Sequence, residues 1–130
     1  MKKKVIIFGT FDGLHAGHLN FFKQARKLGD ELIVVVARDI NVKKNKGKMS
    51  RFSETKRLTA LLAMNVGDSV ILGQICDPYA VIRKYKPDII ALGYDQINFT
   101  EKLKDHFPKI KIVRLKPFKQ KIFKSSLINK

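Results

Sequence analysis

The chain has 130 residues, of which 45% are hydrophobic, and it carries a formal net charge of +16 at neutral pH. This length suits one domain, which we expect to span residues 1–130, and the hydrophobic content excludes a disordered chain. No uncharged apolar stretch approaches the length of a membrane span, and a single cysteine, Cys76, excludes an internal disulfide. We therefore expect a cytoplasmic protein that does not associate with membranes.

The first half of the chain alternates apolar runs with amphipathic stretches. Residues 5–8 are apolar and predict a buried strand, and the helical spacing of apolar residues over 19–28 predicts a helix after it. Residues 31–37 predict a second buried strand, followed by a lysine-rich loop. Ser53 can cap a helix that runs to about residue 65. We expect the inner side of this helix to carry Leu58, Leu61, Leu62 and Val66.

The second half continues the alternation. Residues 69–72 predict a short strand, and Asp77 and Pro78 predict the cap and first residue of the next helix. A strand over 88–92, a helix over 100–107 and a last strand over 109–115 complete the pattern. Such β-α alternation predicts an α/β fold with a Rossmann-like, doubly wound parallel sheet, in which ligands bind beyond the carboxyl ends of the strands.

Residues 9–18 read Gly-Thr-Phe-Asp-Gly-Leu-His-Ala-Gly-His and lie between the first strand and the first helix. The start of a helix favours phosphate, and the imidazoles of His15 and His18 can stabilise charge on a phosphoryl group undergoing displacement. The alternative is that the glycines only form a turn and the histidines only cap a helix. Because the strand, turn and helix are predicted independently of the motif, we favour a phosphate or nucleotide site.

The segments Gly9-Thr10-Phe11-Asp12 and His15-Ala16-Gly17-His18 resemble the signature of the HxGH nucleotidyltransferase superfamily and its cytidylyltransferase-like members. This resemblance implies that an NMP group is transferred from ATP or CTP to a phosphate-bearing acceptor, with release of pyrophosphate. It implies that the imidazoles of His15 and His18 face the α-phosphate and that Asp12 binds the acceptor. The nucleotide pocket would then include Gly9, Thr10, Phe11, Gly17 and His18.

After the strand at 88–92, Gly93-Tyr94-Asp95-Gln96 resembles archaeal-type FAD synthases more than glycerol-3-phosphate cytidylyltransferases. The resemblance places Gly93 and Asp95 in the nucleotide site and favours ATP with FMN. The alternative is CTP with glycerol 3-phosphate or another small polyol phosphate, because the sequence does not show whether an apolar slot for a flavin ring exists.

Further candidate residues are cationic or hydroxylated. The resemblance assigns Arg57 and either Lys44 or Lys46 to the substrate phosphates, although each also suits a surface charge. Residues 123–128 resemble the family's phosphate-binding helix start, with Lys124 where a serine is usual. The resemblance thus adds Lys124, Ser125 and Ser126 to the nucleotide site and Lys119, in place of an arginine, to the acceptor site.

The acceptor phosphate is already anionic, so the implied reaction needs no general base and proceeds by positioning and charge stabilisation. We expect Mg²⁺ to enter with the triphosphate, because no carboxylate cluster suggests a metal site built by the protein. We also expect a homodimer. A basic nucleic-acid-binding module without catalysis is a further alternative, favoured by the charge and opposed by the intact 10–18 segment and the absence of a stripe of stacking aromatics.

Overall fold

A single parallel sheet forms the centre of the computed structural model, which describes residues 3–77, 79–93 and 102–116, without the side chains of residues 45 and 46. Its strands run in the order β3-β2-β1-β4-β5. The elements in chain order are β1 (Lys4–Gly9), α1 (Ala16–Arg26), β2 (Glu31–Val36), α2 (Asp39–Lys46), α3 (Glu54–Met64), β3 (Ser69–Leu72), α4 (Ala80–Tyr85), β4 (Ile89–Leu92), α5 (Leu103–His106) and β5 (Lys111–Arg114). The predicted parallel α/β sheet is confirmed.

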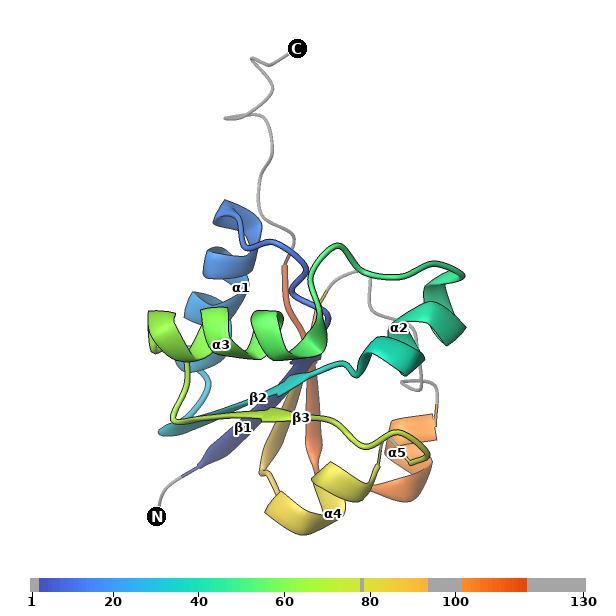
Figure 1. Cartoon of the computed structure of the whole chain (residues 1–130). Coiled ribbons are helices and arrows are strands. Elements are labelled where there is room, and N and C mark those ends of the chain that lie inside the picture. Colours follow the sequence, from blue (N-terminus) through green and yellow to red (C-terminus); the bar gives the residue numbers. More distant parts are fainter. Residues whose placement is uncertain (1–2, 78, 94–101, 117–130) are drawn as a thin grey trace.

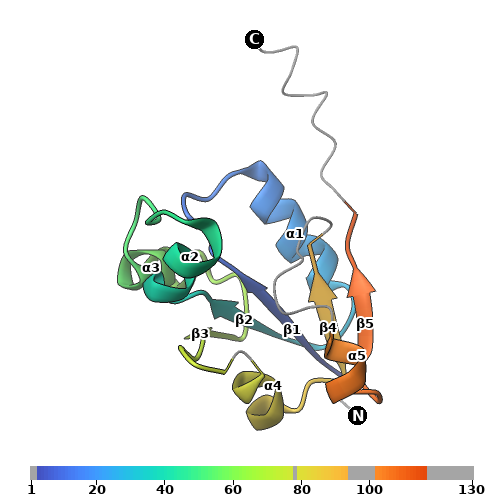
Figure 2. The ribbon, with the colours of Figure 1, turned by 90° about the vertical axis from the view of Figure 1, so that its right-hand side faces the viewer.

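Helices cover both faces of the sheet, with α1 and α3 on one side and α4 and α5 on the other (Figures 1 and 2). Successive residues of β1 serve the two faces, since Val5 and Ile7 belong to the core under α1 and α3, while Ile6 and Phe8 belong to the core under α4 and α5. This two-sided burial explains why the strand reads as a continuous apolar run. None of the helices within the described ranges is long and apolar enough to cross a membrane.

The strand order reverses between β1 and β4, which pair directly at the middle of the sheet, Val5 beside Ile89. In open parallel sheets the crevice beyond the carboxyl ends at such a reversal is where ligands bind. The turn that contains His15 follows β1, and Gly93 follows β4. The fold therefore places both sequence motifs beside this crevice.

The prediction of a lysine-rich loop after β2 is wrong, because Lys43, Lys44 and Lys46 lie on helix α2. Lysine is a good helix former, and Asp39 provides a favourable negative charge in the first turn. Val42 is buried, which anchors the helix to the core. Gly47 ends it with a left-handed backbone (φ 77°), and its N–H donates to the carbonyl of Lys43 at 2.8 Å.

Two further predictions are wrong in detail. Leu62 is 55% exposed, because the buried side of α3 is centred on Arg57 and Leu61 and each residue advances about 100° around a helix. Helix α4 begins at Ala80 with Tyr79 at the N-cap position, so Asp77 is not the cap, and its carboxylate accepts a hydrogen bond from Tyr79 N–H at 2.9 Å. Pro78 lies outside the described residues. The predicted Ser53 cap of α3 is confirmed by its bond from Lys56 N–H.

Candidate functional site

The two histidines of the turn form a reciprocal cap at the start of α1. Nδ1 of His15 accepts a hydrogen bond from Gly17 N–H at 3.0 Å, and Nδ1 of His18 accepts one from His15 N–H at 3.3 Å. This is the arrangement of a capping box, with imidazole nitrogens in place of the usual oxygen acceptors. The alternative that the histidines cap a helix is thus partly correct, since both rings do cap α1.

Capping fixes how each imidazole presents itself to a ligand. A ring nitrogen that accepts a hydrogen bond carries no proton, so the proton of each neutral ring is on Nε2. The two ring centroids are 3.9 Å apart, and the rings are inclined by 31°. Two imidazoles this close together can both donate from Nε2–H to a phosphoryl group bound at the start of α1.

The glycines of the turn make room for two rings. A Cβ on Gly17 would lie 2.8 Å from His15 Cε1, and one on Gly9 would lie 2.5 Å from Phe11 Cζ. Phe11 itself has a left-handed backbone (φ 55°), unusual for a bulky residue, and its buried ring meets the edge of His18 with centroids 5.6 Å apart. Through this contact with Phe11, the strained turn fixes the position of the His18 ring.

The carboxylate of Asp12, which is predicted to bind the acceptor, also binds the loop before α3. Its carboxylate accepts hydrogen bonds from the backbone N–H groups of Arg51 (2.6 Å) and Phe52 (2.9 Å). Partial burial of Asp12 is the largest influence on its pKa and raises it, but these two donors and the charges of Arg51 and Arg57 together outweigh burial and leave the pKa below its ordinary value of 3.8. The carboxylate thus joins the turn after β1 to the loop before α3.

Arg57 is a buried residue of α3 whose side chain has 0% exposure. Its guanidinium donates to the carbonyl oxygens of Thr10 (2.8 Å) and Phe52 (3.1 Å) and to the carboxylate of Asp39 (2.6 Å). Thr10, predicted to lie in the nucleotide pocket, is therefore tied to α3 through its backbone. Asp39 is not among the predicted site residues, because it meets Arg57 only through tertiary structure and no local pattern in the sequence marks that contact.

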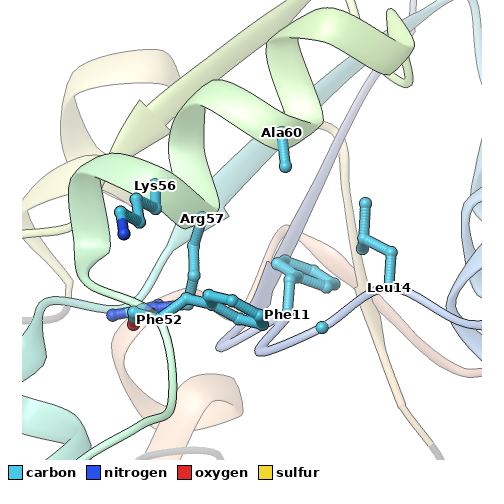
Figure 3. Close-up of a pocket in the computed structure, with 7 residues that line it drawn as sticks. Phe11, Leu14, Phe52, Lys56, Arg57 and Ala60 are labelled. Atoms are coloured by element: carbon cyan, nitrogen blue, oxygen red, sulfur yellow. Dashed lines mark hydrogen bonds between the residues drawn. The ribbon is translucent and has the colours of Figure 1, made fainter.

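A pocket of about 400 Å³ opens between α3 and the turn after β1, and Figure 3 shows the side chains around it. Phe11 and Phe52 lie on one side, with Lys56 and Ala60 projecting from α3 above them. Gly13, Leu14 and Arg57 complete the lining. This mostly apolar space adjoins the histidine turn through Leu14, the residue before His15.

The structure describes only some of the remaining predicted residues. Lys44 is exposed on α2, and the side chain of Lys46 is outside the described part. The carbonyl oxygen of Gly93 accepts a hydrogen bond from Arg114 at 2.8 Å, which joins the ends of β4 and β5. Asp95, Lys119, Lys124, Ser125 and Ser126 lie outside the described residues. Within the described ranges, no group of three or more His, Cys, Asp or Glu residues could hold a metal ion.

Comparison with known proteins identifies FAD synthases that are similar to this chain in sequence. The chain is 40% identical to the FAD synthase of Thermoplasma volcanium over 98% of its own length and 92% of that protein. It is 42% identical to the FAD synthase of Pyrococcus abyssi over 86% of this chain and 79% of that protein. These identities extend well beyond the ten-residue histidine motif.

Solved structures share the fold. A Thermoplasma volcanium structure described as a lipopolysaccharide core biosynthesis protein matches with a TM-score of 0.83 and 41% identity, over 92% of this chain and 100% of the other. Pantoate-beta-alanine ligase from Francisella tularensis shares the fold alone, with a TM-score of 0.60, 16% identity and coverage of 92% of this chain and 61% of the other. The cytidylyltransferase-like family model matches residues 6–128, so the chain belongs to the cytidylyltransferase-like family.

Proposed function

We propose that the protein is an FMN adenylyltransferase, an FAD synthase that transfers AMP from ATP to the phosphate of FMN and releases pyrophosphate. The observation that carries the proposal is the pair of capped imidazoles at the carboxyl end of the central strand, in a chain 40% identical to a named FAD synthase over 98% of its length. The attacking oxygen belongs to the FMN phosphate, which is anionic at neutral pH.

In the proposed reaction an oxygen of the FMN phosphate attacks the α-phosphorus of ATP, and the bond from that phosphorus to the bridging oxygen of pyrophosphate breaks. Negative charge grows on the α-phosphate oxygens and on the leaving group. The Nε2–H groups of His15 and His18 would donate to these oxygens where the charge develops. Cationic side chains from α2, with Lys44 or Lys46 foremost, would hold the outer phosphates.

We further propose that Mg²⁺ enters with ATP. Magnesium retains several waters and is commonly bound through substrate phosphates with few protein ligands. Bound there, it would neutralise part of the triphosphate charge. The residues of this chain would meanwhile orient the α-phosphate.

The cellular location and the oligomeric state are also proposed. We infer that the enzyme acts in the cytoplasm, supported by its single cysteine. We also infer a homodimer, in which the exposed Leu62 (55%) and Met64 (45%) of α3 are candidate contact residues. Sedimentation equilibrium measures the mass directly, and a monomer at assay concentrations would contradict the homodimer.

A pyrophosphate-release screen tests the substrates. ATP and CTP are each paired with FMN, glycerol 3-phosphate, choline phosphate, inositol phosphate and phosphopantetheine, and FAD is identified by chromatography. The proposal expects release with ATP and FMN that requires both compounds and yields FAD. Release with CTP and a polyol phosphate, and none with ATP and FMN, would assign the alternative cytidylyltransferase reaction.

A further inference from the structure

The guanidinium of Arg57 connects three segments that are far apart in the sequence. Its three acceptors are the carbonyl of Thr10 on the turn after β1, the carbonyl of Phe52 on the loop before α3, and the carboxylate of Asp39 at the start of α2. The histidine turn and the lysine-bearing helix are thereby fastened to the same side chain.

Asp39 extends this connection to the backbone of both helices. Its Oδ2 accepts a hydrogen bond from Glu54 N–H at 3.1 Å, and Glu54 Oε1 accepts one from Asp39 N–H at 2.8 Å. Each carboxylate therefore satisfies a backbone donor at the start of the other helix. Ser50 Oγ adds a longer bond, at 3.4 Å, to Asp39 Oδ1. As a result, the start of α2 is fixed relative to the start of α3.

Burial determines what Arg57 can do. The side chain has 0% exposure, while that of Asp39 has 27%. A buried charge is tolerated only with good partners, so separating Arg57 from its acceptors would strongly destabilise the fold. Because the side chain has no exposed surface, a phosphate in the crevice could reach the guanidinium only after these contacts rearrange. Arg57 therefore influences the reaction more readily through the three segments that it contacts than by binding a phosphate itself.

We propose that Arg57 and Asp39 are a positioning pair for nucleotidyl transfer. They hold the start of α2, and with it the lysines of that helix, in fixed relation to the backbone of Thr10 and the histidine turn. Arg57 itself does not bind the triphosphate. The choice of ATP and FMN as assay substrates rests on the proposed function, whereas the structural role does not.

The variants Arg57→Lys, Arg57→Met, Asp39→Asn and the double variant Arg57→Met with Asp39→Asn test this pair. Lysine keeps the positive charge but lacks the planar fork that reaches three acceptors. We expect both Arg57 variants to lower kcat about 10- to 100-fold, the scale of a misplacement of about 1 Å, and to raise the KM for ATP as well, because the lysines of α2 are displaced with the helix. The double variant should be no slower than Arg57→Met, since the partners act as one unit.

Arg26→Met is the matched control. It removes an arginine that pairs with Asp68 at 2.7 Å, but this pair is 49% and 41% exposed and lies in the last turn of α1. We expect its kcat to equal that of the parent. Parental kcat in Arg57→Lys would overturn the proposal. A raised KM for ATP at unchanged kcat in Arg57→Met would also overturn it and would assign Arg57 to phosphate binding.

Peptide-resolved amide hydrogen exchange separates this proposal from the proposed function, because it needs no substrate. Arg57→Met and Arg57→Lys should speed exchange in residues 9–18 and 47–53 and leave the strand at 89–92 unchanged. Failure of the parent to make FAD contradicts only the proposed function, and unchanged exchange in both segments contradicts only the positioning pair. Should Arg57→Met not fold, the double variant, which leaves neither charge of the pair unpartnered, carries the measurement.

Discussion

At the scale of single residues, the imidazoles of His15 and His18 combine a structural and a chemical role. The backbone engages Nδ1 of each ring, which places the proton of the neutral ring on Nε2. The cap therefore selects the tautomer that donates to phosphate. Substitutions at this turn can separate the two roles, since helix capping needs only an acceptor.

We predict that His15→Asn retains the fold and loses activity. Asparagine is a good N-cap and preserves the acceptor for Gly17 N–H, but it has no group at the place of Nε2–H. Turnover should fall by about 100-fold or more, the cost of losing a donor to a developing negative charge. Pyrophosphate release and thermal unfolding, measured side by side with His18→Ala, check this. Turnover within a few-fold of the parent in both variants would remove the imidazoles from the mechanism.

Gly17→Ala should also separate stability from activity. Alanine favours an α-helix over glycine by about 1 kcal/mol, so the helix itself gains. The added Cβ, however, lies 2.8 Å from the His15 ring and must push it out of its capping position. We expect a melting temperature close to that of the parent, because the gain in helix propensity and the loss of the His15 cap, each about 1 kcal/mol, offset one another, with turnover reduced about 10-fold or more. Parental turnover would show that the position of the His15 ring is not critical.

Acid should weaken the fold through Asp12 and Asp39. Partial burial raises the pKa of Asp39, but the hydrogen bond and charge of Arg57 and the N–H of Glu54 outweigh it, so its pKa, like that of Asp12, is lowered from 3.8. A lowered folded-state pKa stabilises the fold above the unfolded value and loses this effect as pH falls through the folded value. The free energy of unfolding should therefore decrease as pH drops below about 3.8.

Urea denaturation at a series of pH values measures this decrease. Asp39→Asn should show a shallower dependence on pH than the parent, because one of the responsible carboxylates is absent. Asp30→Asn is a suitable control. The carboxylate of Asp30 accepts an exposed hydrogen bond from the backbone N–H of Lys3, at the end of β1 away from the histidine turn. Parallel curves for the parent and Asp39→Asn would contradict the assignment.

At the scale of elements, strands were predicted more reliably than what connects them. Residues 5–8 and 32–37 are apolar on both faces, a pattern that few structures other than a buried parallel strand satisfy, and both predicted strands are confirmed by β1 and β2. Helix α2 was missed because a helix whose sequence is Asp-Ile-Asn-Val-Lys-Lys-Asn-Lys has a single buried apolar residue and no amphipathic period. Its stability comes from Asp39, Glu54 and Gly47, which periodicity does not register.

The candidate site was predictable where it depends on local sequence. The turn from Gly9 to His18 is contiguous, so its motif could be recognised and placed beside the sheet. Asp39, Glu54 and Arg57 approach one another only through tertiary structure, and an arginine in a single sequence looks the same whether it faces solvent or the core. Burial of Arg57 could therefore not be predicted, although its importance could.

Helix α2 provides the next prediction. Lys44→Ala or Lys46→Ala should raise the KM for ATP about 10-fold or more, because a hydrogen bond to a charged group is worth roughly 1.5–3 kcal/mol. The exposed Lys104 of α5, on the other face of the sheet, supplies the control Lys104→Ala. Parental KM values in both α2 variants would exclude α2 from triphosphate binding.

At the scale of the whole molecule, the net charge of +16 bears on the choice between an enzyme and a nucleic-acid-binding module. The enzyme should bind RNA weakly, with an affinity that falls steeply as salt rises through counterion release, and should bind ATP with Mg²⁺ saturably. Titration of labelled RNA and labelled ATP at two salt concentrations checks both. Tight RNA binding that resists salt, without ATP binding, would favour the module.

The central place of β1 also has a consequence for how the chain is made. Lys3 bonds to Asp30, 27 residues away, but Lys4 bonds to Asp88, 84 residues away, so one neighbour of the first strand is synthesised early and the other late. At 5–20 residues per second, the ribosome takes roughly 4 to 17 s to bridge the longer interval. During that time β1 has an unpaired edge of strongly apolar sequence, which is prone to aggregate. The crevice between β1 and β4 does not exist until residue 92 has been added, so a nascent chain that already contains both histidines still lacks the site.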